Sequence, residues 1–159
     1  MGRPIIVGMN NPLSMRPEHA LYPAPRGCAG HRLWSVLHDA CGASRSDYLR
    51  AFERVNLVTG EWSSPAAQMA ASAMLPRLAS RRVALLGTEV WRAFELDAGA
   101  EVLSCSSIDV VLSIVPRHVE MVRFYRVPHP SGRNRWFNDP INRAAVGRLL
   151  GDLYKGAAS

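Results

Sequence analysis

Lysine is almost missing from this sequence. Of the 19 lysine and arginine residues, only Lys155 is a lysine. Arginine forms forked hydrogen bonds to phosphate, so the bias is typical of phosphate recognition, although a GC-rich genome would produce it as well. Acidic residues are also few, at 13, which leaves a net charge of +6 and a sequence pI near 9.9. This excess predicts a polyanionic partner, most often a nucleic acid.

Cysteine is scarce as well. Cys28, Cys41 and Cys105 are far apart and lack the paired spacing of zinc sites or disulfide frameworks. An iron–sulfur cluster held by four thiolates would lack its fourth ligand. We therefore expect free thiols that are buried or partly buried, and neither a metal nor another cofactor.

Long hydrophobic runs are also absent. No apolar stretch approaches the roughly 20 residues of a membrane-spanning helix, and the first residues do not have the pattern of a signal peptide. The sequence therefore predicts a cytoplasmic protein without a membrane segment. Its 159 residues, 48% hydrophobic and 20% charged, suit one globular domain over residues 1–159.

Short apolar runs alternate with stretches of helical periodicity. We expect β-strands at 5–8, 54–58, 82–87, 108–115 and 121–127, and helices at about 30–41, 47–53, 65–78, 88–94 and from 139 onward. Thr88 is the expected N-cap of the fourth helix, and the last helix is expected to bury Ile141, Val146, Leu149, Leu150 and Leu153. The alternation predicts a single α/β domain with a mostly parallel central sheet and helices on both faces.

Polar loops follow four of the predicted strands, after Gly8, Val58, Gly87 and Val127. In open α/β sheets, ligands bind beyond the carboxyl ends of the strands. Because parallel strands end at the same edge of a sheet, we expect these loops to converge on one rim. The long loop at 9–30, with four prolines, adds to the same region.

The first of these loops is Gly8-Met9-Asn10-Asn11-Pro12. A glycine here allows the backbone to approach a ligand closely, and an asparagine carbonyl can hold a water molecule without acting as a strong base. A plain Asx turn before proline explains the same residues without any chemistry.

Two further side chains suit a site at this rim. His129 lies between Pro128 and Pro130, which stiffen its backbone, and a neutral histidine there could donate a hydrogen bond to an oxygen that gains charge. A structural histidine before proline is the alternative. Asn56 ends a predicted buried strand, where its paired donor and acceptor could read the edge of a pyrimidine.

The C-terminal third is strongly basic. Between Pro116 and Arg148 the chain has seven arginines, and Trp136 and Phe137 follow Arg135 directly. This combination is typical of phosphate binding together with base stacking or insertion. A solvated basic face whose aromatic rings pack against the last helix is the alternative.

Together, GMNNP after the first strand and HPSGRN near the C-terminus resemble the two signature motifs of the uracil-DNA glycosylase superfamily. The HPSGRN segment is most similar to the single-strand-selective monofunctional branch, and the first motif is shared with that branch and the mismatch-specific branch. The resemblance implies a uracil-DNA glycosylase-like three-layer fold. It also implies hydrolysis of the N-glycosidic bond of a pyrimidine that is flipped out of DNA.

The resemblance also implies a role for each matching residue. Asn10 or Asn11 would position the attacking water, because the motif can be aligned from either end, and His129 would stabilise the departing base. The residues implied to contact the base are Gly8, Met9, Pro12, Leu13, Tyr22 and Asn56, with Tyr22 stacking on it and Asn56 reading its edge. Those implied to grip DNA are Ser131, Gly132, Arg133, Asn134 and Arg135, with Arg133 as the wedge that fills the vacated stack.

The chain departs from the close branches at Leu13, where they have glycine. Since this neighbourhood screens the pyrimidine 5-position in the family, the expected base is uracil or a 5-substituted pyrimidine, as would suit a phage or anti-phage enzyme. The lone Lys155 predicts a monofunctional enzyme, because glycosylases that also cleave the backbone use an amine to form a Schiff base. The alternatives are a non-catalytic DNA-binding homologue and a nucleoside- or nucleotide-processing enzyme. We expect a monomer.

Overall fold

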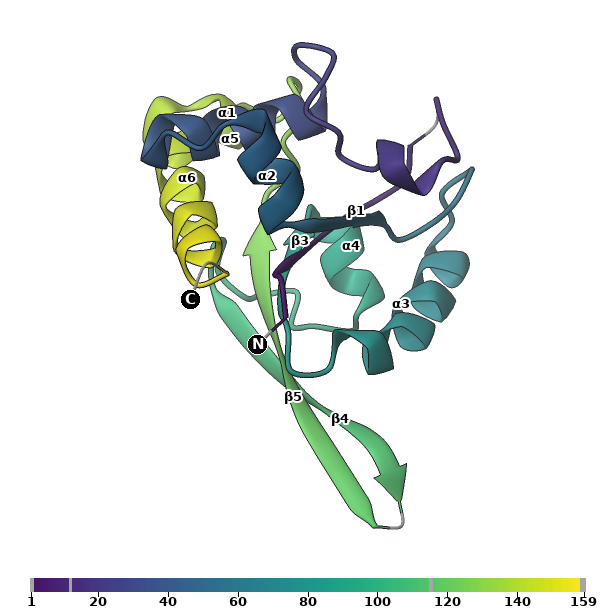
Figure 1. Ribbon diagram of the computed structural model, residues 1–159. Coiled ribbons are helices and arrows are strands. Elements are labelled where there is room, and N and C mark those ends of the chain that lie inside the picture. Colours follow the sequence, from purple (N-terminus) through teal and green to yellow (C-terminus); the bar gives the residue numbers. More distant parts are fainter. Residues whose placement is uncertain (1, 12, 115, 158–159) are drawn as a thin grey trace.

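In the computed structural model, which describes residues 2–11, 13–114 and 116–157, the chain forms a five-stranded sheet of order β2-β1-β3-β5-β4 (Figure 1). The strands are β1 (Ile5–Gly8), β2 (Glu53–Asn56), β3 (Arg82–Leu86), β4 (Cys105–Ile114) and β5 (Arg117–Val127). Strands β2, β1, β3 and β5 are parallel, and β4 runs antiparallel beside β5. The predicted α/β fold with a mostly parallel sheet is confirmed.

Helices cover both faces of the sheet, which gives three layers (Figure 1). Alternate residues of the strands point to opposite faces, so Ile5 and Val7 enter the core beneath α3 and α4, whereas Ile6 enters the core beneath α1, α2 and α6. The helical elements are η1 (Pro17–His19), α1 (Ala29–Cys41), α2 (Arg45–Ala51), α3 (Ser64–Leu78), α4 (Thr88–Ala93), α5 (Arg135–Asn138) and α6 (Pro140–Lys155).

Two helix starts differ from the prediction. Helix α2 begins earlier than expected because Ser44 and Asp47 form a capping box, and it ends before Glu53, which belongs to β2 instead. Helix α4 is preceded by Gly87 as its N-cap, in place of the predicted Thr88. The φ of Gly87 is +89°, in the region that favours glycine, so the chain turns one residue sooner than the sequence pattern indicated.

Burial was predicted wrongly at Ile141 and Cys105. Ile141 is exposed, because it lies in the first turn of α6, where its backbone N–H is held by the capping side chain of Asp139. Val146, Leu150 and Leu153 of the same predicted stripe are buried. Cys105 is an exposed free thiol because it begins the edge strand β4, whereas the other two cysteines are partly buried.

The two longest strands form a hairpin that projects beyond the body of the molecule (Figure 1). Only the carboxyl-terminal part of β5, from Arg123 to Val127, pairs with β3. Both hairpin strands are longer than the sequence predicted. Among the residues that the structure describes, no helix is both long and apolar enough to cross a membrane.

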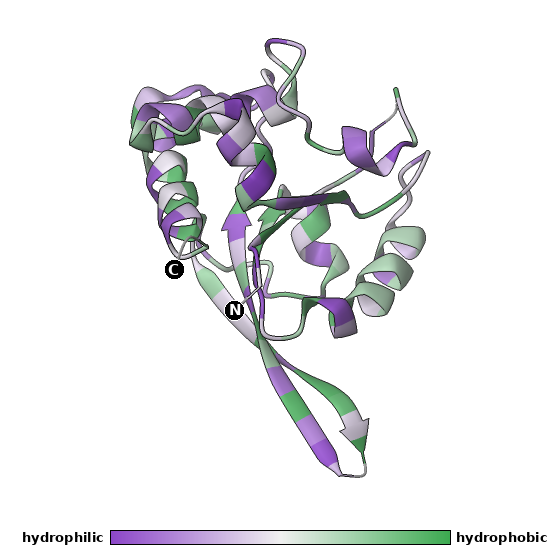
Figure 2. Ribbon diagram, in the orientation of Figure 1, coloured by the Kyte–Doolittle hydropathy of each residue, from purple (hydrophilic) through white to green (hydrophobic). Residues whose placement is uncertain are grey.

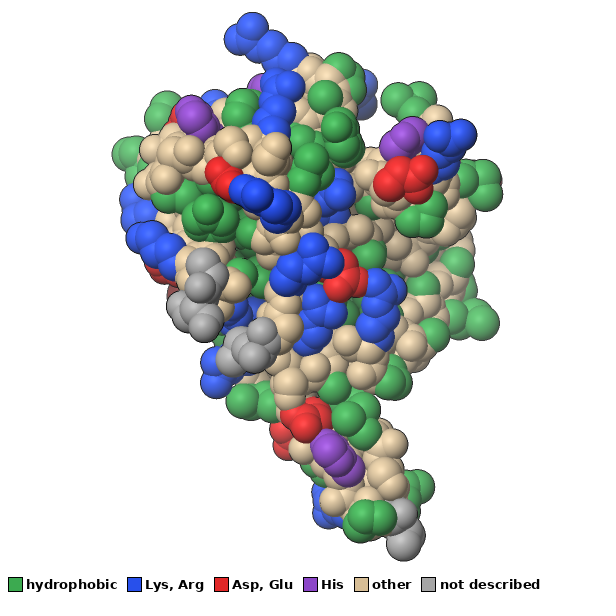
Figure 3. All heavy atoms as spheres, viewed as in Figure 1, with side chains coloured by type: hydrophobic (Ala, Val, Ile, Leu, Met, Phe, Trp, Pro, Cys, Tyr) green, Lys and Arg blue, Asp and Glu red, His purple; other side chains and the backbone are tan. Residues whose placement is uncertain are grey.

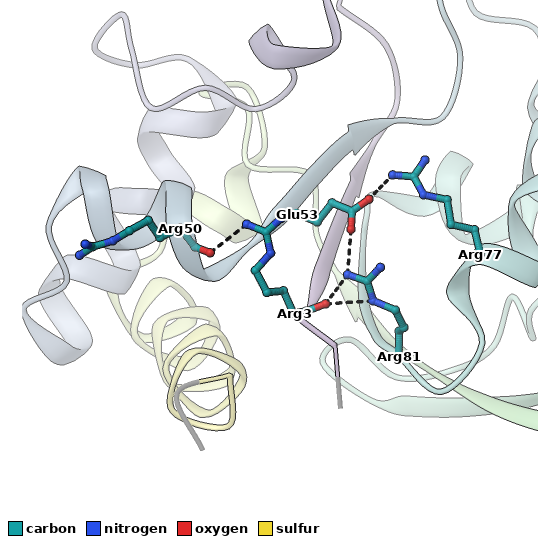
Figure 4. Close-up of polar contacts among 5 residues, drawn as sticks. All are labelled: Arg3, Arg50, Glu53, Arg77 and Arg81. Atoms are coloured by element: carbon teal, nitrogen blue, oxygen red, sulfur yellow. Dashed lines mark hydrogen bonds and ion pairs between the residues drawn. The ribbon is translucent and has the colours of Figure 1, made fainter.

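A group of arginines surrounds Glu53 at the amino-terminal end of β2 (Figure 4). Glu53 forms ion pairs with Arg77 and, at 2.8 Å, with Arg81. Arg81 Nε also donates to the carbonyl of Arg3 at 3.0 Å, and Arg3 donates to the carbonyl of Arg50 at 3.1 Å. Burial alone would raise the pKa of Glu53, but the hydrogen bonds from Arg81 and Arg77 lower it below its ordinary value. The network ties α2, β2 and α3 to the segments that precede β1 and β3, at the end of the sheet opposite the predicted rim.

Replacing Glu53 by glutamine should lower the free energy of unfolding by about 1–2 kcal/mol at neutral pH, because the arginines lose their carboxylate partner. Since the folded pKa of Glu53 is lowered, its contribution is present above the unfolded pKa of about 4.3 and is lost as pH falls through the folded value. Urea unfolding at neutral pH and at about pH 3 should therefore show the difference shrinking in acid. The exposed Glu61→Gln should behave like the wild type, and an equal loss at both pH values would exclude an ionic contribution.

Candidate functional site

The carboxyl ends of β2, β1, β3 and β5 lie side by side at one edge of the sheet, as the parallel pairing requires. We call the segments that follow them, residues 57–60, 9–11, 87–88 and 128–134, the rim. Neighbouring strands are about 4.8 Å apart, so the ends of β1 and β5 are separated by roughly 10 Å. The predicted convergence of the loops on one rim follows directly from this topology.

Gly8 and Asn56 are in contact at the rim. They are paired in the register of β1 with β2. A Cβ atom at Gly8 would lie 2.8 Å from Oδ1 of Asn56 and 3.3 Å from the side chain of Leu21. A side chain at position 8 would therefore displace the half-buried Asn56 amide, and glycine leaves room for it.

The two asparagines that follow differ in how their side chains are used. Asn10 donates through Nδ2 to the carbonyl of Gly60 at 2.8 Å, which fixes the amide and leaves Oδ1 to accept from a water molecule. Asn11 accepts through Oδ1 from the backbone N–H of Leu13 at 3.0 Å in an exposed Asx turn. This geometry favours Asn10 over Asn11 for water positioning. Pro12, which follows Asn11, lies outside the described residues.

The other candidate base contacts differ in burial. Met9 packs against the core beneath α3 and anchors the loop. Leu13 is 94% exposed, so its side chain is free to meet a ligand but is not held in place by packing. Tyr22 is 45% exposed and presents its ring from a loop whose backbone is fixed.

The loop that carries Tyr22 is held from below by α1 and α2. The hydroxyl of Tyr48 donates to the carbonyl of Leu21 at 3.1 Å. A Cβ atom at Gly30 would lie 2.2 Å from the carbonyl oxygen of Tyr22 and 2.3 Å from that of Leu21. Only glycine permits this approach of α1 to the loop. The side chain of Leu21, in the same loop, lies close to Gly8.

Replacing Gly30 by alanine should destabilise the fold by about 2–3 kcal/mol, because the added methyl group must push backbone atoms apart. We expect the same change to weaken binding of any ligand that stacks on Tyr22. Gly132→Ala is the matched control, since a Cβ there meets nothing within 4 Å. Urea unfolding of both variants measures the difference, and equal stabilities would contradict the close approach.

His129 lies beside Gly87 at the ends of β5 and β3. A Cβ atom at Gly87 would lie 3.2 Å from Cβ of His129, so this glycine also makes room for a site residue. The imidazole is half-buried, and burial lowers the pKa of His129 below its ordinary value. The ring is therefore neutral at neutral pH and can donate one N–H to a ligand oxygen.

The segment after His129 is closed by Asn134. Its Nδ2 donates to the carbonyl of His129 at 2.8 Å, and its Oδ1 accepts from the backbone N–H groups of Trp136 and Phe137 at the start of α5. Both ends of the amide are thus used within the chain. Asn134 therefore shapes the loop, and its amide has a second N–H that these contacts do not use.

The remaining residues of this segment are available at the surface. Arg133 and Arg135 are exposed, Gly132 is exposed with open space beside it, and Ser131 is half-buried. Beyond them, Phe137 is fully buried in the core beneath α6, with Trp136 packed half-buried against the same core. Phe137 therefore packs the protein interior rather than DNA.

The site residues line two separate cavities. Asn11 and Asn56 line a cavity of about 210 Å³ between η1, β2 and α3, together with Arg16, Arg54 and Arg77. His129 and Asn134 line a smaller one of about 140 Å³ with Gly87 and Arg126. The strand ends of β1 and β3 lie between the two groups, so one cavity does not hold Asn56 and His129 together.

Three glycines outside the predicted site residues fix this arrangement. Gly60 supplies the carbonyl that holds Asn10, Gly87 accommodates His129, and Gly30 accommodates the loop of Tyr22. Gly60 and Gly87 follow predicted strands, so their positions were a usable signal. The need for Gly30 depends on a contact between segments that the local sequence does not reveal.

No protein-family model, curated protein or solved structure matches the chain in comparisons with known proteins. Within the described residues, no three histidine, cysteine, aspartate or glutamate side chains gather closely enough to hold a metal ion. The described rim segments carry asparagine, histidine and arginine side chains.

Proposed function

We propose that the chain is a monofunctional DNA glycosylase of the cytoplasm that hydrolyses the N-glycosidic bond of uracil or a 5-substituted pyrimidine and leaves an abasic site. One observation carries the proposal. The segments that resemble the two superfamily motifs come from opposite ends of the sequence, and the parallel sheet brings them to the same rim, with an anchored asparagine on one and a neutral histidine on the other.

The reaction requires that a water molecule be positioned and that the departing base be stabilised. The carbonyl of Asn10 would hold water against C1′ of the flipped nucleotide. As the bond from C1′ to the base nitrogen breaks, its electron pair leaves with the base, whose oxygen would accept a hydrogen bond from neutral His129. The water oxygen bonds to C1′, and its proton ends on the released base.

The base would lie over the ends of β1 and β3, between the two cavities. Asn56 would read its edge from one side, and Tyr22 would stack on its face. Met9 and Leu13 would lie nearest the substituent at the 5-position. The exposed Leu13 side chain is not packed against the protein, so space for a 5-substituent supports a modified pyrimidine as well as uracil.

Phosphate contacts would come from the surface beside His129, where Arg133 and Arg135 are exposed. The net charge of +6 supports a polyanionic partner, and binding should weaken steeply with salt as arginines release counterions from DNA.

A monofunctional mechanism is supported by the position of the only lysine. Lys155 is the last residue of α6, whereas α6 begins near the rim at Pro140. At about 1.5 Å per residue, the helix carries Lys155 roughly 22 Å away from that end. Its amine is therefore badly placed to form a Schiff base at the rim, and trapping with borohydride should yield no covalent adduct.

The test is alkaline cleavage of labelled oligonucleotides, single- and double-stranded, that contain uracil, 5-hydroxymethyluracil or other 5-substituted pyrimidines. We expect an alkali-labile abasic site from at least one of them. Absence of cleavage on every substrate, with DNA binding retained, would favour the non-catalytic homologue. Release of base from free nucleosides but not from DNA would favour the nucleoside-processing enzyme.

Replacing Arg133 by alanine should reduce excision from duplex DNA about tenfold more than excision from single strands, because only a duplex has a vacated stack to fill. Parallel rate measurements on both substrates test this. Arg50→Ala, an exposed arginine at the opposite sheet edge, should change neither rate. An equal loss of excision rate on both substrates would show that Arg133 contacts phosphate and does not fill the vacated stack.

A further inference from the structure

The projecting end of the β4–β5 hairpin carries exposed hydrophobic side chains (Figure 3), and hydrophobic residues lie along both of its strands (Figure 2). Ile114 is 83% exposed and Val111 is 52% exposed, and Leu112, Val119 and Met121 are exposed as well. Five exposed large hydrophobic side chains on one projecting segment are unusual on a protein that remains monomeric in water. The candidate site does not account for these exposed hydrophobic side chains.

A β-bulge gathers most of these side chains on one face. Val111 pairs with Val119, and the register then shifts so that Ile114 pairs with Arg117. Paired residues share a face of the sheet, as do alternate residues of β5, so the bulge brings Ile114 to the same side as Val111. The resulting surface, which we call the hairpin face, consists of Asp109, Val111, Ile114, Arg117, Val119 and Met121. The opposite face carries Val110 and Val122, which are buried in the core.

The hairpin face lies far from the rim. Strand β5 runs from Arg117, near the hairpin tip, to Val127, which precedes the rim segment of His129. Its 11 residues span roughly 35 Å at about 3.3 Å per residue. The hairpin face is therefore a separate surface, and inferences about it do not depend on the proposed glycosylase function.

The charges on the hairpin face are arranged at its two ends. Arg117 lies at the tip, and Asp109 lies at the end nearer the body, with the apolar residues between them. If two copies place these faces together with their hairpins antiparallel, the Asp109 end of each copy meets the tip of the other, where Arg117 lies beside Ile114. A two-fold interface requires such a self-complementary pattern, since each residue meets the partner's opposite end.

The outer edge of β4 is open, since no described strand pairs with it in the five-stranded sheet. Its sequence, CSSIDVVLSI, has ten residues, one charge and neither lysine nor proline. The bulge between Val111 and Ser113 interrupts this edge, and bulges hinder the pairing of edge strands. Association through the hairpin face is therefore favoured over pairing along the edge.

We propose that the chain forms a two-fold dimer in which the hairpin faces of two copies pack against each other with their hairpins antiparallel. This departs from the monomer expected from the sequence. The two rims point away from the shared interface, so each copy keeps its candidate site accessible.

Sedimentation equilibrium or light scattering of the full chain over a range of concentrations tests the proposal. We expect a species of twice the 17.5 kDa of one chain. Ile114→Glu should raise the dissociation constant at least about tenfold, because a carboxylate would be buried in an apolar contact. Met69→Glu, at an exposed methionine of α3, is the control and should leave the dimer unchanged. A single-chain mass at every concentration, or a dimer that Ile114→Glu does not weaken, would overturn the proposal.

A charge exchange tests the antiparallel arrangement itself. Asp109→Arg and Arg117→Asp should each weaken the dimer, because each creates two like-charged contacts across the two-fold axis. The double variant restores opposite charges and should dimerise more tightly than either single variant. A double variant weaker than both single ones would exclude the arrangement. Thermal unfolding of each variant verifies that the fold is retained, and Ile114 and Arg117 at the tip lie outside the core.

Discussion

Replacing Asn10 by alanine should reduce the rate of base excision by about 10³-fold, because the water would lose the group that holds it against C1′. The amide of Asn10 is anchored through Nδ2 to the carbonyl of Gly60 at 2.8 Å, which orients Oδ1. Alanine removes that acceptor and leaves the backbone of the loop in place. Single-turnover excision measures the loss, and fluorescence anisotropy should show DNA affinity unchanged within about twofold.

Asn11→Ala is the matched control for this experiment. The Oδ1 of Asn11 already accepts from the backbone of Leu13, so its loss should cost less than tenfold in rate through a looser turn. The opposite result, with Asn11→Ala inactive and Asn10→Ala active, would assign the water to Asn11. It would also select the other alignment of GMNNP with the family motif.

The rim was predictable because it depends on strand direction alone. Apolar runs that end in Gly8 and Val127, separated by helical stretches, predict parallel strands, and parallel strands place their following loops together. The site therefore follows from periodicity and from the rule that ligands bind beyond strand ends. The burial of the Asn56 strand was predicted wrongly, because β2 is an edge strand and its residues are half-buried, whereas β1 is buried.

The remaining features depend on contacts that periodicity does not encode. Asn134 lies in the HPSGRN segment, where a contact with DNA was predicted, yet its amide caps α5 and closes the loop of His129. Gly30 carries no turn signal, and its role appears only when α1 meets the loop of Tyr22. The hairpin was underestimated because alternation at its tip places apolar residues in solvent, where a sequence pattern assigns them to a core.

Replacing His129 by alanine should lower the excision rate by about 10²–10³-fold, the usual effect of removing one donor that stabilises a developing anion. The ring lies half-buried beside Gly87, and Gly87→Ala should displace it, because the new Cβ would lie 3.2 Å from that of His129. His31→Ala, on α1, is a control that leaves this donor in place. Single-turnover rates on the best substrate from the cleavage assay measure all three variants.

The dependence of the excision rate on pH distinguishes a neutral His129 donor from a protonated His129 imidazolium. Burial lowers the pKa of His129, so the wild-type rate should stay level as pH falls from neutral to about 6.5. Because the folded pKa lies below the unfolded one, stability also falls in acid below that point, and circular dichroism must accompany each rate. His129→Gln keeps an uncharged N–H donor and should recover about tenfold over His129→Ala. A rate that rises as pH falls through about 6.5, with glutamine no better than alanine, would mean that the cationic ring stabilises the departing base.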